Sequence, residues 1–467
     1  MDFPVVIEKL TTIIEGLTNE ITALKGRIAY LEGENKALRQ ENGHLQEEND
    51  RLKERLGLDS TNSSLPPSRD LYRAKRNSRP KSDRSPGAQA GHKPNFYQLQ
   101  SPDEIINVFP EACSCGSLLE IDPTFRAEQR IEIPPLKPHV TEYRLYQGVC
   151  QVCGKKKAAT LPKEVRSDLL GDHAKAIISA LSGFFHNSKR DVQQILKDIF
   201  HLPISLGLVS NTEKRVNQKL KPCYQELVQH IEESPYLHID ETGHRCRGEK
   251  GWGWLLTSRE VSVLKLASSR GKKILQSLLP AYNGQVISDL YGAYCYFEEE
   301  KRQICWSHLK RDFLRFAHSR NAALTQAGND LGQICQEVFT LYKALKNQTI
   351  NSLLFTRRIR KLKKRMLHIL KGVLQVPDTP HAHKVAQNLL KSFTMMWRFV
   401  DHPEVEPTNN LAERQIRKYV VYRKKCLFTW SQRGNEFIER ILSLFLTSRL
   451  QKLSPFLKLE SLIAQPL

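Results

Sequence analysis

The chain has 467 residues, enough for about three domains, and 40% of them are hydrophobic, which suffices for folded cores. Lysine and arginine number 71 against 50 aspartates and glutamates, and the resulting net charge of +21 indicates a polyanionic partner, most often nucleic acid. No run of 18 apolar residues and no signal-peptide pattern is present, so we expect no membrane span and a cytoplasmic protein whose ten cysteines are thiols or metal ligands.

Residues 1–58 carry a seven-residue repeat. Leucine stands at every seventh position from Leu10 to Leu52, and the positions three residues earlier hold isoleucine up to Ile28 and asparagine from Asn35 to Asn49. This pattern is typical of a parallel two-stranded coiled coil in which buried asparagines fix the register. The segment therefore predicts a homodimer or a higher oligomer, with a solvated helix or an intramolecular hairpin as alternatives.

Residues 59–95 are rich in serine, proline, glycine and basic residues, with few apolar ones. Such a composition predicts a basic flexible linker. Contact with DNA phosphates and simple solvation are equally consistent with it.

Residues 96–165 contain short apolar runs and two cysteine pairs, each followed by glycine. The pairs are Cys113 with Cys115 and Cys150 with Cys153. Two such turns are typical of the halves of a four-thiolate Zn²⁺ site. The first pair has one intervening residue instead of two, so buried thiols without metal remain the alternative.

Residues 166–233 are predicted to be helical. A helix over 188–200, a turn and a second helix over 206–220 have the proportions of a helix-turn-helix, with Arg215 and Lys219 on the second helix as candidate DNA contacts. A plain packing hairpin fits the pattern equally well.

Residues 234–432 begin with three strands in a meander, followed by a helix and a fourth strand. This is the order of a ribonuclease-H-like α/β core. A long helical stretch follows, an insertion at about 315–400, and it includes the strongly basic segment 357–365. Residues 433–467 form a helical tail. The fold class is thus a multidomain α/β protein.

Two aspartates end strands of this core: Asp240 ends the first and Asp289 the fourth. These strands are neighbours in such a core, so both carboxylates emerge at one edge, whereas Glu241 faces the opposite side. With Glu413 they would suffice for two Mg²⁺ (or Mn²⁺) ions that activate an attacking oxygen and stabilise the leaving one. The alternative for Glu413 is a capping box with Asn410 as N-cap.

Four motifs in order, "HIDETG", "SDLYGAY", "CWSHLKRDF" and "PTNNLAERQIR", resemble transposases of the insertion sequence 66 family, bacterial members of the Asp-Asp-Glu group. The resemblance extends over nearly the whole chain. It implies a ribonuclease-H-like core with a helical insertion and a catalytic triad of Asp240, Asp289 and Glu413. The family's "CWxH" motif falls on Cys305, Trp306 and His308. The family commonly has C-x-x-C where this chain has Cys113-Ser114-Cys115, which leaves zinc binding open.

The resemblance implies a transposase that binds the terminal inverted repeats of its own element, cleaves DNA and joins the freed 3′-hydroxyl to target DNA. It also implies a place at the bacterial nucleoid and small accessory proteins as partners. Basic residues near the motifs are expected to face phosphate: Lys310, Arg311, Arg414, Arg417 and Lys418. A non-catalytic dimeric DNA-binding protein, either a regulator or a decayed transposase, is the alternative.

Overall fold

The computed structural model describes residues 3–56, 99–110, 114, 117, 119–162, 168–319, 321–377 and 379–465. The chain divides into two compact units, one made of Met1–Arg73 and Glu226–Val420 and the other of Ala74–Gln225 and Val421–Leu467. The linker predicted at 59–95 lies outside the described residues. No helix among those described is both long and apolar enough to cross a membrane.

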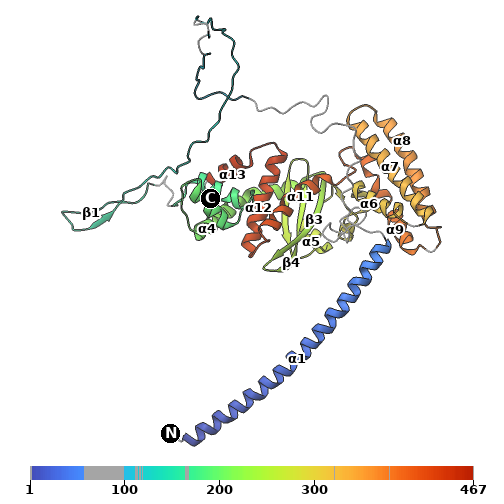
Figure 1. Ribbon diagram of the computed structural model, residues 1–467, viewed down its shortest axis with the longest axis horizontal. Helices are drawn as coiled ribbons and strands as arrows, with labels where there is room; N and C mark the ends of the chain where they lie inside the picture. The colour runs from blue at the N-terminus through green and yellow to red at the C-terminus, as the bar shows by residue number, and fades with distance from the viewer. Residues whose placement is uncertain are drawn as a thin grey trace. The chain divides into compact units, whose positions relative to one another are not determined.

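The heptad segment forms one continuous helix, α1, over Phe3–Leu56 (Figure 1). In the single chain the heptad leucines whose side chains are described face solvent; Leu24 is 59% exposed and Leu31 is 46% exposed. A helix with such a row of exposed leucines retains an apolar face for a partner, and the parallel pairing of two chains stays a prediction.

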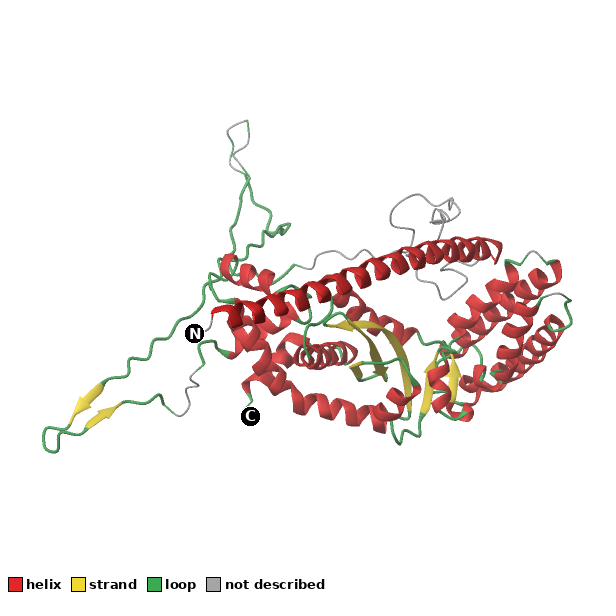
Figure 2. Cartoon of the chain, turned by 90° about the horizontal axis from the view of Figure 1, so that it is seen from below, coloured by secondary structure: helices red, strands yellow, loops and turns green. Residues whose placement is uncertain are grey.

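A mixed five-stranded sheet forms the centre of the first unit (Figure 2). Its strands are β3 (Tyr236–Cys246), β4 (Glu249–Thr257), β5 (Ser262–Ala267), β6 (Gln285–Ser288) and β7 (Arg302–Ile304). The order across the sheet is β5-β4-β3-β6-β7; β3, β4 and β5 are antiparallel, while β6 runs parallel to both β3 and β7. The predicted meander and the predicted adjacency of the first and fourth strands are both confirmed.

The hairpin between β3 and β4 closes through Arg247 and Gly248, both of which have positive φ. Two consecutive residues with positive φ give a turn whose twist matches that of the strands. The hairpin therefore fixes the register of β3, the strand that carries Asp240.

Helices cover the two faces of the sheet. The strand β3 alternates, so His238, Asp240 and His244 face one side and Glu241 the other. On the first side lies α11 (Asn410–Lys425), whose Tyr419 hydroxyl is 2.5 Å from His244 Nδ1. A Cβ at Gly253 would lie 2.7 Å from the Tyr419 ring, so this glycine permits the close approach of the helix. In the sequence, the connections between β5 and β7 contain α5 (Lys272–Leu278) and the 3₁₀ helices η2 (Gly292–Tyr296) and η3 (Glu299–Lys301). The helix α6 (Trp306–Ala317) follows β7.

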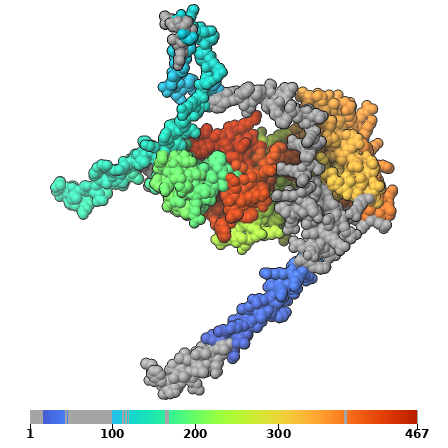
Figure 3. Space-filling model, viewed as in Figure 1, coloured from blue at the N-terminus to red at the C-terminus, as the bar shows by residue number. Residues whose placement is uncertain are grey.

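The predicted helical stretch at about 315–400 is confirmed. It consists of α7 (Ala322–Lys346), α8 (Ser352–Val373), α9 (Pro380–Lys391), η4 (Thr394–Met396) and α10 (Arg398–Asp401). These elements surround an aromatic core in which the Trp306 indole N–H donates to the Met396 carbonyl at 2.7 Å. In α8, Ile359 and Leu362 are buried and most of the basic side chains of 357–365 are exposed. Figure 3 shows this part, in orange, as one closely packed body.

The second unit combines helices with the extended segment at residues 99–162. Its helices are α2 (Asp172–Ser182), α3 (Lys189–Asp198), α12 (Gln432–Leu450), α13 (Pro455–Ala464) and the first part of α4 (Leu206–Glu233). Ser188 caps α3 in a reciprocal capping box with Asp191. The helices predicted at 188–200 and 206–220 are α3 and α4, and α4 continues past Pro222 to Glu233. Between residues 99 and 162, the described strands are β1 (Gln147–Val149) and β2 (Lys156–Ala158), an antiparallel pair.

Candidate active site

Asp240 and Asp289 lie where the parallel pairing of β3 and β6 ends. Asp289 directly follows β6 as predicted, but the prediction that Asp240 ends its strand is wrong, because β3 continues beyond it as the partner of β4. The parallel register pairs His238 of β3 with Ile287 of β6. Continuing this register by two residues places Asp240 beside Asp289. The pairing of Ser288 with Ile304 brings Cys305 level with Asp289 in the same way. Level residues on parallel neighbours point to the same face, so two carboxylates and a thiol line one edge.

Burial makes this edge electrostatically unfavourable for negative charge. Burial raises the pKa of Asp240 to about 8, and the nearby charges of Glu241, Asp289 and Glu413 add to the rise. The backbone N–H of Glu241 donates to Asp240 Oδ1 at 3.0 Å, and that of Tyr291 donates to Asp289 Oδ1 at 2.8 Å. The neighbouring carboxylates are therefore close enough to Asp240 to disfavour its charged form, which is the setting in which a cation binds carboxylates well.

Asn409 joins the start of α11 to the sheet. It is 1% exposed, and its side-chain amide donates to the Ile239 carbonyl at 2.7 Å while its oxygen lies 3.2 Å from His238 Nδ1. Its backbone N–H donates to Cys305 Sγ at 3.1 Å. The helix that carries Glu413 is therefore fixed both to β3, one residue before Asp240, and to the end of β7.

The capping-box interpretation of Glu413 is wrong in this structure. The Glu413 N–H donates to the Asn409 carbonyl at 3.1 Å, so Asn409 is the N-cap and Glu413 is one position too far along for the reciprocal bond. Asn410 accepts a hydrogen bond from the Ser307 hydroxyl instead. Glu413 Oε1 is buried and has no hydrogen-bond partner among the described residues. Its carboxylate is free to bind something else.

Cys305, His308 and Glu413 form a group whose donor atoms all lie within 4.8 Å of one another, and Asp240 and Asp289 lie outside it. His308 Nδ1 is 3.6 Å from Glu413 Oε1. Burial lowers the pKa of His308 and the positive charge of Arg311 lowers it further, so the imidazole is neutral at neutral pH. Burial also raises the pKa of the Cys305 thiol.

Glu241 is bound on the other face of the sheet. Its Oε1 accepts from Arg270 Nε at 2.7 Å and also from Nη2, and its Oε2 accepts from the Tyr294 hydroxyl. The Arg270 guanidinium lies 3.6 Å from the centre of the Tyr291 ring. These contacts hold the turn after Asp289 against β3. Sequence reasoning identified neither Arg270 nor the two tyrosines as supports of the site; only the repeated tyrosine in "SDLYGAY" could have signalled them.

The predicted DNA-contacting residues have different surroundings. On α6 Lys310 is exposed and Arg311 half-buried, and on α11 Arg414 and Arg417 are exposed and Lys418 half-buried. In the second unit, Arg215 pairs with Asp168, which Lys175 also contacts at 2.7 Å. Lys219 donates to the carbonyl of Gln465. Lys310, Arg414 and Arg417 are thus exposed on the two helices that also carry His308 and Glu413. Arg215 and Lys219 already have partners within their own unit.

Cys150 and Cys153 lie exposed in the turn between β1 and β2. The backbone N–H groups of Cys153 and Val152 donate to the Cys150 sulfur, which lowers the pKa of this thiol. Gly154 closes the turn with a φ of +66°. Cys113 and Cys115 lie outside the described residues.

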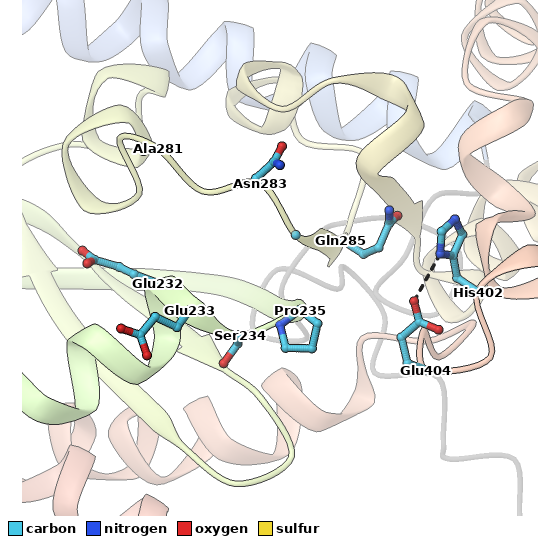
Figure 4. Close-up of a pocket in the computed structure, with 10 residues that line it drawn as sticks. Glu232, Glu233, Ser234, Pro235, Ala281, Asn283, Gln285, His402 and Glu404 are labelled. Carbon is cyan, nitrogen blue, oxygen red and sulfur yellow. Dashed lines mark hydrogen bonds and ion pairs between the residues drawn. The ribbon is translucent and has the colours of Figure 1, made fainter.

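A cavity of about 460 Å³ opens elsewhere on the first unit (Figure 4). Pro235, just before β3, and Gln285, which begins β6, line it, so it lies at the opposite end of these strands from Asp240 and Asp289. Its wall is acidic, with Glu232, Glu233 and Glu404, and Glu404 contacts His402 at 3.1 Å. An acidic wall does not suit phosphate, so this cavity is not part of the candidate active site.

Comparison with known proteins agrees with the geometry. A family model described as "Transposase IS66 family" matches residues 188–437, which is more than half of the chain and includes β3 to β7 and α11. The chain belongs to this transposase family. A second model, a family of unknown function (DUF6444), matches residues 10–96 of this IS66-family chain. The chain is also 22% identical over 386 residues to the uncharacterized protein y4jD of Sinorhizobium fredii (strain NBRC 101917 / NGR234), which covers 76% of this chain and 74% of the relative.

Proposed function

We propose that this IS66-family chain is an active DNA transposase that binds the terminal inverted repeats of its own element and cuts and joins DNA with Asp240, Asp289 and Glu413. One observation carries the proposal. In a chain of this family, Asn409 holds the helix of Glu413 against the strand of Asp240, and leaves a buried Glu413 oxygen without a partner. A protein that only binds DNA has no need for this arrangement.

The strand order supports a ribonuclease-H-like core. Three antiparallel strands are followed by two parallel strands, β6 beside the first and β7 beside β6, with Asp240 inside the first strand and Asp289 directly after the fourth. The long helical insertion then separates Asp289 from Glu413, as the resemblance to the family implies.

The acidic residues fit hard divalent cations, Mg²⁺ or Mn²⁺, and the proposed site holds two of them. Three carboxylates, one with its pKa raised to about 8 and one with a buried oxygen lacking a partner, offer the oxygen donors that these ions prefer. When bound, the ions supply Lewis-acid activation of the attacking oxygen and neutralise charge on the leaving one.

The chain's own residues position the reactants. In the first step water cleaves a phosphodiester at the element end and leaves a 3′-hydroxyl and a 5′-phosphate. In the second step that hydroxyl attacks a target phosphodiester, forms a new bond to the phosphorus and releases the target's 3′-hydroxyl. Lys310, Arg414 and Arg417 are exposed beside the site and hold the phosphates. The exposed basic side chains of α8 add positive charge that can contact phosphate, so binding should weaken strongly with salt.

Three further parts of the proposal concern partners. The α1 helices pair two chains or more in a parallel coiled coil. Cys150 and Cys153, with Cys113 and Cys115, bind one Zn²⁺, and the N–H groups that donate to the Cys150 sulfur favour its thiolate. Small accessory proteins complete the assembly on DNA.

The test is Glu413→Gln in the full chain, assayed twice on a labelled element end. We expect mobility-shift binding to survive, because losing one negative charge does not weaken phosphate contacts. We expect nicking with Mg²⁺ to fall by orders of magnitude, because a ligand is lost. The matched control is Glu404→Gln, which lies at the opposite end of the strands and should nick normally.

Near-normal nicking by Glu413→Gln would refute the assignment of Glu413. A wild-type protein that binds the ends and never cuts them would favour the alternative, a regulator or a decayed transposase.

A further inference from the structure

Three different donor types meet beside the carboxylate edge. Cys305 follows β7 and is the N-cap of α6, His308 lies in the first turn of α6, and Glu413 lies on α11. Two hydrogen bonds hold these helices together: the Trp306 N–H donates to the Pro407 carbonyl at 2.9 Å, and the Ser307 hydroxyl donates to Asn410 at 3.3 Å. The three donors therefore come from elements that are fixed relative to one another.

The protein itself does not satisfy two of these donors. His308 Nδ1 and Glu413 Oε1 are both buried, and neither has a hydrogen-bond partner among the described residues. Their separation of 3.6 Å is too long for a hydrogen bond between them. Two ligands on one tetrahedral ion, each at about 2.0 Å from it, lie about 3.3 Å apart. The observed distance is close to that value.

We propose that Cys305, His308 and Glu413 bind one divalent ion of the zinc class. This site is distinct from the Mg²⁺ site of Asp240, Asp289 and Glu413 but shares Glu413 with it. Sulfur and imidazole nitrogen suit Zn²⁺ and Co²⁺, whereas Mg²⁺ selects oxygen. The Asn409 N–H that donates to Cys305 Sγ orients the thiolate, as outer hydrogen bonds do at metal sites. Three protein ligands leave a fourth position open, and the Glu413 side chain, 39% exposed, gives the ion access from solvent.

A consequence follows that rests on the proposed function. An ion held by Cys305 and His308 engages Glu413 and withdraws it from Asp240 and Asp289. Zinc-class ions then compete with Mg²⁺ for the same carboxylate, and DNA cleavage is inhibited by zinc.

The test is metal binding by the full chain without DNA, in a background where Cys113, Cys115, Cys150 and Cys153 are all serine. This background removes the other thiolates expected to bind zinc. With Co²⁺ alone as the probe, we expect one ion per chain, a thiolate-to-cobalt charge-transfer band in the near ultraviolet, and loss of the band when Zn²⁺ is added.

Single substitutions in this four-serine protein test which residues bind the Co²⁺ ion. Cys305→Ser should abolish the band, and His308→Asn should weaken Co²⁺ binding roughly 10-fold or more. The matched control is Cys335→Ser, a buried thiol on α7 outside the donor group, which should keep the band. Cys305 is wholly buried, so its substitution also changes the packing of the core. The His308 side chain is 24% exposed, so His308→Asn is the second, independent variant.

No band in the background protein, or an unchanged Co²⁺ affinity in a folded His308→Asn protein, would overturn the proposal. Because the readout contains no DNA, that outcome leaves the assignment of Asp240, Asp289 and Glu413 to cleavage intact. Loss of nicking in Glu413→Gln, in turn, does not by itself establish the zinc-class site.

Discussion

Asp240 is the residue at which burial and neighbouring charge oppose ionisation together. Its pKa is raised from the ordinary 3.8 to about 8, so between these values the folded chain holds a proton that the unfolded chain has released. The contribution of this carboxyl to stability is therefore present at low pH and is lost as pH rises from about 4 to about 8.

We expect the free energy of unfolding of the metal-free protein to fall over this pH window, and to fall less in Asp240→Asn, which has no proton to lose. Urea unfolding of both proteins at several pH values measures the difference between their slopes, which removes the contribution of other titrating groups. Mg²⁺ at pH 8 should stabilise the wild type more than the variant. Equal slopes in the two proteins would contradict the pKa shift.

Residue by residue, the sequence predicts those parts of the site that depend on local pattern. Asp240 and Asp289 are predicted as site residues because each follows an apolar run in the sequence. Glu413 is predicted because of the resemblance to the insertion sequence 66 family. The position of the N-cap was predicted one residue late, since Asn409 and Asn410 are equally good caps. The choice between them is made by hydrogen bonds from Asn409 to β3, about 170 positions away in the sequence. No local pattern contains such a contact.

Among the elements, the junction of α6 and α7 depends on one glycine. A Cβ at Gly328 would overlap the backbone nitrogen of Ala317, at the end of α6, and would lie 2.6 Å from the Ala317 Cα, and backbone atoms cannot rotate away. Gly332, one turn later in the same helix, has nothing within 4 Å of that position.

We expect Gly328→Ala to destabilise the protein by about 1–3 kcal/mol or more through overpacking. Gly332→Ala, the matched control, should stabilise it by up to about 1 kcal/mol because alanine is the better helix former. Thermal unfolding of the two variants measures both effects. A tolerated alanine at 328 would show that the two helices do not pack this closely.

The hairpin of Cys150 and Cys153 leads to a prediction about metal content. Protein purified without chelator should contain about one zinc per chain, and Cys150→Ser should release it. Cys295→Ser, an exposed cysteine of the first unit, is the control and should leave the metal in place. Elemental analysis of the three proteins decides between a zinc site and unliganded thiols, and a wild-type content near zero favours the thiols.

Periodicity predicts most of the elements but misses β7. This strand, Arg302–Ile304, is short and its first two residues are polar, so it has no apolar alternation. Gln303 is nevertheless fully buried, because its amide donates to the Met396 carbonyl at 3.0 Å and its oxygen accepts from the Phe399 N–H at 2.9 Å. A strand stabilised by contacts with a distant segment looks like a loop in the sequence.

At the scale of the whole molecule, the exposed leucines of α1 predict self-association. We expect sedimentation of the full chain to give at least two copies, and Leu31→Glu to shift it toward one, because a charge would be buried in the seam. Ala29→Glu introduces the same charge outside the leucine and asparagine rows and should leave the assembly unchanged. A wild-type protein that sediments as one chain at tens of micromolar would contradict the coiled coil.

The backbone hydrogen bond between Trp306 and Pro407 also bears on how this protein can vary. The chain leaves the sheet at the first of these residues and returns at the second, and their N and O atoms are 2.9 Å apart. A segment whose two ends meet acts as a module: its length can grow or shrink without changing where Glu413 returns to the sheet. The cost of closing such a loop rises only slowly with its length. Relatives with insertions of very different size can therefore keep Glu413 in the same position relative to β3. The segment between α6 and α11 is then a place where new binding surfaces can be added without moving that residue.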